Sequence, residues 1–202
     1  MFFMMQSNPS KYQPVAEYLR TFIAIKIQPE KMLVQLFSRL QKEFFAENIR
    51  WADPAQLHLT LKFLGETSPL QTEQTKLILE MVAAQFVPFQ FTLRDLGYFK
   101  NQGQPKVLYA GIDDSVILQK LAQETDYQLA GAGFEKETRD FHPHLTLGRI
   151  KSIRNKTHFY ALINEFSNTE FQRVDVKEMI LFQSILTPRG PVYKELKTVV
   201  FR

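Results

Sequence analysis

The chain has 202 residues, of which 45% are apolar, and its 25 lysines and arginines outnumber its 21 aspartates and glutamates. This length and apolar content suit one large domain or two small lobes around a substantial core, and the net charge of +4 mildly favours an anionic partner. The absence of cysteine excludes disulfides, thiolate nucleophiles and cysteine-ligated metal sites, and it is compatible with a cytoplasmic protein.

Residues 1–19 differ from the rest of the chain because they contain Pro9, Pro14 and no sustained periodicity. Their five opening apolar residues lack a preceding basic region and are too few for a signal peptide. No later apolar run approaches the roughly 20 residues of a membrane-spanning helix. We therefore expect a leader at 1–19, one domain at 20–202, no membrane association and a cytoplasmic location.

Strand-like and helix-like patterns alternate through the domain, which indicates an α+β fold with several strands. In the second expected helix, the apolar residues Leu70, Leu77 and Met81 fall on one side together with Ile78 and Ala84. The expected strands are 21–27, 49–51, 57–64, 89–96, 106–112, 144–150, 171–175, 177–186 and 191–201, the expected helices are 30–47, 68–87, 114–129 and 155–167, and 101–105 is an expected loop.

A tetrapeptide recurs in two of these strands, as His58-Leu59-Thr60-Leu61 and as His144-Leu145-Thr146-Leu147. Side chains alternate between the two faces of a strand, so each copy places an imidazole beside a hydroxyl and sends both leucines to the opposite face. Strict alternation also places Lys62 on the face of His58, turns Phe63 inward and turns Arg149 away from the site. Each copy thus predicts a site on one face and a core on the other.

Two facing histidines suit acid–base cleavage of a phosphodiester. Because the unperturbed pKa of histidine is about 6.5, one imidazole can accept a proton from the attacking oxygen while the other protonates the leaving oxygen. Each role typically accelerates a reaction by ~10²–10⁴-fold. Thr60 and Thr146 are candidate donors to the nonbridging phosphate oxygens, and the scheme requires neither a metal nor another cofactor.

An alternative interpretation is a metal site formed by His142 and His144, with His58 or Asp140 as a third ligand. This interpretation leaves the paired threonines without a role. We therefore prefer the acid–base pair.

Several other side chains are candidates for contact with a substrate. Lys62 and His142 are candidate phosphate contacts, whereas Tyr193, which follows the Gly190-Pro191 turn, is the preferred aromatic contact. Aromatic side chains commonly stack on the bases of single-stranded RNA, which also makes Phe63, Phe99 and Phe141 candidates.

The segments His58 to Glu66 and Pro143 to Arg149 resemble the paired His-x-Thr-x motifs of the two-histidine phosphoesterase superfamily, especially its bacterial and archaeal RNA 2′,3′-cyclic phosphodiesterases, which are also named 2′-5′ RNA ligases. The resemblance extends to Phe22-Ile23-Ala24-Ile25, to Trp51 and to the closing residues Ser184 to Tyr193. It covers residues 20–202. In that family the position of His142 is often basic.

The resemblance implies a bilobed, pseudo-twofold fold with an antiparallel sheet in each lobe, flanking helices and an active-site groove between the lobes. It also implies hydrolysis of a terminal 2′,3′-cyclic phosphate of RNA to a 2′-phosphate, with His58 as the proton donor and His144 as the proton acceptor. Ligation through a 2′-5′ linkage would use a 5′-hydroxyl in place of water. The implied partners are RNA ends with a cyclic phosphate, and no obligate protein partner is evident.

Two other functions remain open at this point. One is a noncatalytic module that binds RNA or nucleotides in the groove. The other is a related phosphodiesterase that acts on 2′-5′ linked oligonucleotides or on small cyclic nucleotides.

Overall fold

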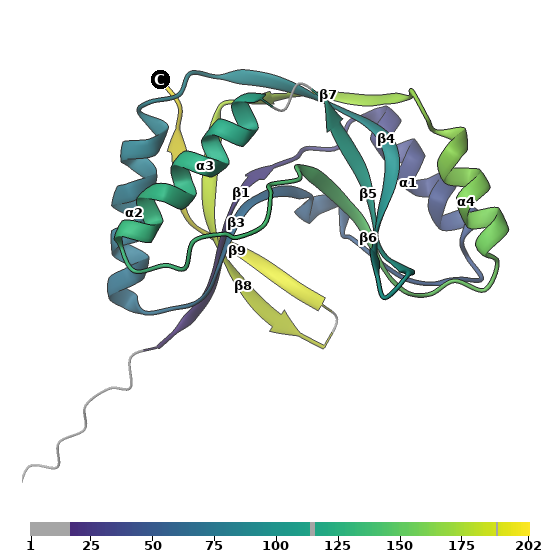
Figure 1. The fold of residues 1–202 in the computed structure, drawn as a ribbon, viewed down its shortest axis with the longest axis horizontal. Helices are drawn as coiled ribbons and strands as arrows, with labels where there is room; N and C mark the ends of the chain where they lie inside the picture. The colour runs from purple at the N-terminus through teal and green to yellow at the C-terminus, as the bar shows by residue number, and fades with distance from the viewer. Residues whose placement is uncertain (1–16, 114–115, 189) are drawn as a thin grey trace, which may run out of the picture.

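The structure is a computed structural model that describes residues 17–113, 116–188 and 190–202. It contains two antiparallel sheets, each with helices packed against it, so the fold is α+β and bilobed as predicted (Figure 1). No helix within the described ranges is both long and apolar enough to cross a membrane. Of the expected leader at 1–19, residues 1–16 lie outside the described residues. The first strand begins at Leu19, one residue before the expected start of the domain.

The first sheet has the strand order β3-β1-β8-β9. Helix α2 (Pro69–Ala83) packs against β8 and β9, and helix α3 (Val116–Gly131) packs against β3 and α2. Strand β1 is buried on both faces, because Ile23 faces the main core whereas Phe22 and Ala24 join a smaller apolar cluster on the opposite face. The strands of this sheet are β1 (Leu19–Lys26), β3 (His58–Thr67), β8 (Glu178–Thr187) and β9 (Gly190–Val200).

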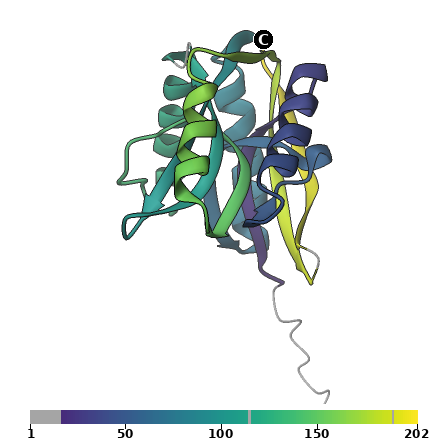
Figure 2. The ribbon, with the colours of Figure 1, turned by 90° about the vertical axis from the view of Figure 1, so that its right-hand side faces the viewer.

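The second sheet has the order β2-β6-β5-β4-β7. Helix α1 (Lys31–Glu43) packs against β7 and helix α4 (Lys156–Glu165) against β4. Figure 2 turns this lobe toward the viewer and shows both helices, which are joined by an ion pair of 2.6 Å between Arg39 and Glu165. The strands are β2 (Asn48–Trp51), β4 (Phe89–Asn101), β5 (Gln104–Asp113), β6 (His144–Ser152) and β7 (Glu170–Val176).

The two lobes are not the two halves of the sequence. The chain leaves the first sheet after β1, returns to it with β3, leaves again for β4 and β5, and returns finally with β8 and β9. One continuous apolar core joins both lobes. The two His-containing strands therefore belong to different sheets, although both lie on the same body of packed side chains.

One expected loop is a tight hairpin instead. Strand β4 extends to Asn101 and β5 begins at Gln104, which leaves only Gln102 and Gly103 between them. These two residues have positive φ angles of 47° and 74°, as the two-residue turns that match the twist of a hairpin require. The prediction of a loop at 101–105 was wrong because Gln-Gly is a weaker turn signal than Asn-Gly.

The apolar stripe expected for α2 lies on its solvent side. Leu70, Leu77 and Met81 are 69%, 63% and 55% exposed, whereas Thr72 and Thr75 are buried. Each threonine hydroxyl donates to the carbonyl four residues earlier in the helix, at 2.9 and 2.7 Å, so neither hydroxyl is left unsatisfied in the core. The helix therefore faces the core with a side that the apolar pattern alone does not indicate.

Candidate active site

The two motif strands meet across the lobes, because β3 and β6 contact each other. Leu59, Leu61, Leu145 and Leu147 are buried at 0%, 7%, 0% and 0% exposure, which confirms the prediction that the leucines enter the core. The other four motif residues lie on the opposite face of their strands, and their side chains are half-buried. They are His58, Thr60, His144 and Thr146.

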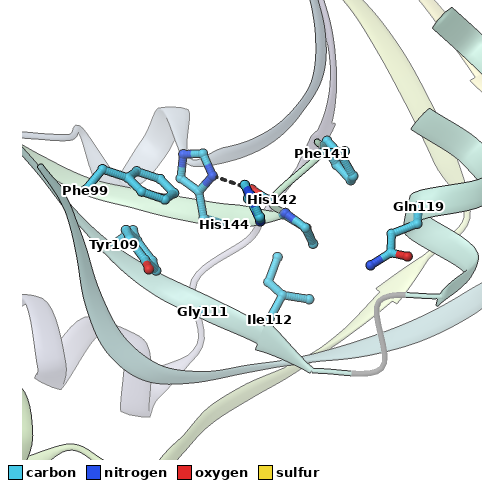
Figure 3. A pocket seen from close by; sticks show the side chains of 9 residues that line it. Phe99, Tyr109, Gly111, Ile112, Gln119, Phe141, His142 and His144 are labelled. Carbon is cyan, nitrogen blue, oxygen red and sulfur yellow. Dashed lines mark hydrogen bonds between the residues drawn. The ribbon is translucent and has the colours of Figure 1, made fainter. Parts of the chain in front are cut away.

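Each histidine is held by its own strand in the same way. Nδ1 of His58 lies 2.8 Å from the carbonyl oxygen of Gln56, and Nδ1 of His144 lies 2.8 Å from the carbonyl oxygen of His142 (Figure 3). A carbonyl only accepts, so each ring donates through Nδ1–H. In the neutral ring, Nε2 therefore carries a free lone pair for proton transfer.

Both histidines favour the neutral form. Burial is the main cause that lowers the pKa of His58 and of His144, and the positive charge of Arg149 lowers both pKa values further. The hydrogen bonds to the backbone carbonyls act in the opposite direction. The charge of protonated His144 also lowers the pKa of His58, so the two imidazoles interact electrostatically.

Both strands carry a β-bulge at the last residue of the motif. In β3 the partners of Ile23 and Ala24 are Lys62 and Thr60, so Leu61 is the extra residue. In β6 the partners of Leu108 and Tyr109 are Gly148 and Thr146, which makes Leu147 the extra residue. An extra residue shifts the alternation by one, and the fifth residue after each histidine therefore returns to the face of the histidine.

The bulges overturn three predictions. Lys62 does not share the face of His58: it points into the protein, is 7% exposed and pairs with Asp126 at 2.5 Å. Phe63 does not point inward and is 65% exposed on the groove side, where it packs against Phe22. Arg149 does not turn away, since it is exposed and its charge acts on both histidines.

Aromatic rings surround each imidazole. The ring centroids of Phe22 and Tyr193 lie 5.0 and 4.9 Å from that of His58. The corresponding distances from His144 are 4.8 Å to Phe99 and 5.5 Å to Tyr109.

An open cavity lies beside each histidine. The larger one, of about 510 Å³, adjoins His144 and is lined by Phe99, Tyr109, Phe141 and His142, as Figure 3 shows. A smaller one of about 50 Å³ adjoins His58 and includes Tyr193.

The structure thus brings together most of the candidates from the sequence. His142, Phe99 and Phe141 line the cavity at His144, and Tyr193 lies beside His58. Tyr109 was not a candidate, although its place opposite Thr146 in the neighbouring strand puts it at the site. Within the described residues, no group of three His, Cys, Asp or Glu side chains is arranged to hold a metal ion, so the alternative ligand set around His142 and His144 does not converge.

Comparisons with known proteins agree with this arrangement. The sequence matches the family described as LigT like Phosphoesterase over residues 25–109 and 112–193. A relative from Methanocaldococcus jannaschii, named RNA 2′,3′-cyclic phosphodiesterase, is 33% identical over 179 residues, which cover 89% of this chain and 99% of the relative. A relative of the same name from Thermotoga maritima is 34% identical over 88% of this chain and 93% of its own length.

Solved structures share the fold. The structure of E. coli LigT complexed with 3′-AMP superposes with a TM-score of 0.73 at 27% identity and covers 92% of this chain and 99% of that protein. A structure described as a phosphoesterase gives a TM-score of 0.74 at 26% identity over 92% and 99% of the two chains. From the two matched motifs, the bilobed fold and these similarities together, we conclude that the chain belongs to the LigT-like, two-histidine phosphoesterase family.

Proposed function

We propose that this protein hydrolyses the terminal 2′,3′-cyclic phosphate of RNA to a 2′-phosphate without a metal ion. The observation that carries the proposal is the pair of imidazoles on two strands that contact each other. Each imidazole is held through Nδ1, which leaves Nε2 for proton transfer, and each shares the face of its strand with a half-buried threonine. Relatives that are 33% and 34% identical carry the name RNA 2′,3′-cyclic phosphodiesterase, which supports this choice of substrate.

In the proposed reaction, Nε2 of His144 takes a proton from water as the water oxygen bonds to phosphorus. The bond between phosphorus and O3′ breaks, and Nε2–H of His58 protonates O3′, which leaves a 3′-hydroxyl and a 2′-phosphate. The hydroxyls of Thr60 and Thr146 donate to the nonbridging oxygens, where negative charge concentrates, and the guanidinium of Arg149 stabilises the same charge. A 5′-hydroxyl in place of water would give a 2′-5′ linkage by the same steps.

The test is incubation of the purified protein with an oligoribonucleotide that ends in a 2′,3′-cyclic phosphate, in the presence of EDTA, followed by identification of the phosphate position. We expect only the 2′-phosphate. His58→Ala and His144→Ala should each lower kcat by about 10²–10⁴-fold. His158→Ala is the matched control, because His158 lies on α4 and its side chain is 41% exposed.

A 3′-phosphate product, or loss of activity with the chelator, would refute the proposed reaction. Binding of the oligonucleotide without turnover would favour a noncatalytic binding module instead. Faster turnover of 2′-5′ linked oligonucleotides or of small cyclic nucleotides would assign the same histidines to a different substrate.

A further inference from the structure

Two arginines lie side by side at the edge of the second sheet. Arg50 on β2 is the direct cross-strand partner of Arg149 on β6, so both side chains leave the sheet on the same face, with Cβ atoms about 5 Å apart. Arg149 follows the bulge after the second motif and faces the histidines. Arg50 is therefore one strand farther from His144, on the outermost strand of that sheet.

Neither guanidinium has an anionic partner within the part of the chain that the structure describes. Among the residues that the structure describes, no Asp or Glu forms an ion pair with Arg50 or Arg149, whereas Arg39 and Arg94 are both paired. Both residues are exposed. Like charges that lie directly opposite each other in a sheet are destabilising, so this pair has a cost in the free protein that a bound anion would remove.

The hairpin of the other lobe makes room for Arg50. A Cβ atom on Gly190 would lie 2.4 Å from Nη2 of Arg50, so only glycine lets the guanidinium sit against the start of β9. The φ angle of Gly190 is +137°, which glycine also adopts most readily. Arg50 therefore reaches from the second sheet to the first sheet at Gly190. Its charge also lowers the pKa of Tyr193 on β9, against the larger effect of burial, which raises that pKa.

We propose that Arg50 binds the phosphodiester that precedes the terminal cyclic phosphate, and that this protein therefore recognises the end of an RNA strand rather than a cyclic mononucleotide. The inference rests on the proposed function, in which Arg149 and the histidines hold the terminal phosphate. The next phosphate of the strand then meets the neighbouring guanidinium, whose planar array of donors matches two phosphate oxygens at once.

Two substrates test the proposal: a 2′,3′-cyclic mononucleotide and a trinucleotide that ends in a 2′,3′-cyclic phosphate. Arg50→Gln should raise KM for the trinucleotide about 10-fold and leave that for the mononucleotide within about twofold. The slope of log(kcat/KM) against log[salt] for the trinucleotide should become shallower by about 0.7, the value for one lost contact to a single strand. Arg50→Lys should raise KM for the trinucleotide less than Arg50→Gln does, because lysine keeps the positive charge but lacks the planar array of donors.

Arg173→Gln is the matched control, since Arg173 is an exposed arginine on β7 at the opposite edge of the same sheet. Equal effects of Arg50→Gln on both substrates, or no effect on either, would overturn the phosphate subsite while leaving the proposed function intact.

A binding measurement separates failure of the subsite from failure of the proposed reaction. Fluorescence anisotropy with a labelled trinucleotide that carries a 2′-phosphate requires no turnover. If the parent protein hydrolyses neither cyclic substrate, weaker binding by Arg50→Gln than by Arg173→Gln still supports the subsite, and equal binding by the two variants overturns it.

Discussion

The buried ion pair between Lys62 and Asp126 gives the sharpest prediction about stability. Their side chains are 6% and 18% exposed, and Nζ of Lys62 also donates to the carbonyl of Glu135 at 2.8 Å. Lys62→Met leaves the carboxylate of Asp126 largely buried without its cation. Removal of one partner of a buried pair typically costs about 3–5 kcal/mol, and we expect about 3 kcal/mol here because Asp126 keeps a hydrogen bond from the backbone NH of Glu137.

Urea unfolding measures this cost, and the corresponding decrease in Tm is about 6–12 °C for a protein of this size. Lys26→Met is the matched control: Lys26 pairs with Glu195, but the two side chains are 38% and 43% exposed, so its loss should cost less than about 1 kcal/mol. The double variant Lys62→Met/Asp126→Leu should lose less unfolding free energy than the two single variants lose together. Equal losses for Lys62→Met and Lys26→Met would refute the assignment of a strong buried pair.

Two further predictions concern the site. Burial lowers the pKa values of both His58 and His144 below the usual 6.5. The value of kcat/KM, which reports the free enzyme, should therefore be greatest below pH 6.5 and decline as rising pH removes the proton of the acid. Arg149→Gln removes a charge that lowers both pKa values, so it should move the pH profile to higher pH, and an unchanged profile would contradict this charge effect. Gly97→Ala places a Cβ 2.4 Å from the ring of Tyr109, which must then move relative to His144, so the Tm should fall and activity should decrease roughly 10–100-fold. Adding Tyr109→Leu to the Gly97→Ala variant should restore the Tm, and failure to do so would exclude this clash as the cause of the lower Tm.

Much of the architecture could be predicted because strands and helices follow from local patterns. Alternation in the two motifs placed Leu59 and Leu145 in the core, and the family resemblance indicated that the two strands face each other. The side chains of Lys62, Phe63 and Arg149 could not be placed by the same rule, since a single extra residue in a strand inverts every side chain beyond it.

Other features depended on tertiary structure. Arg50 precedes Trp51 in a short strand, and no local pattern indicates that it is paired with Arg149 or that it approaches Gly190. The orientation of α2 could not be predicted from hydropathy either. Its buried threonines form hydrogen bonds within the helix, so they occupy core positions although hydropathy assigns them to solvent.

The two bulged strands hold their histidines identically, but the residue that returns to the groove is Phe63 in one and Arg149 in the other. With identical surroundings, the two histidines would be interchangeable as acid and base. A guanidinium on one strand, a phenyl ring on the other and a different pair of aromatic rings at each imidazole remove this equivalence. In the proposed reaction the two imidazoles can therefore keep separate roles, one as the donor and one as the acceptor of a proton.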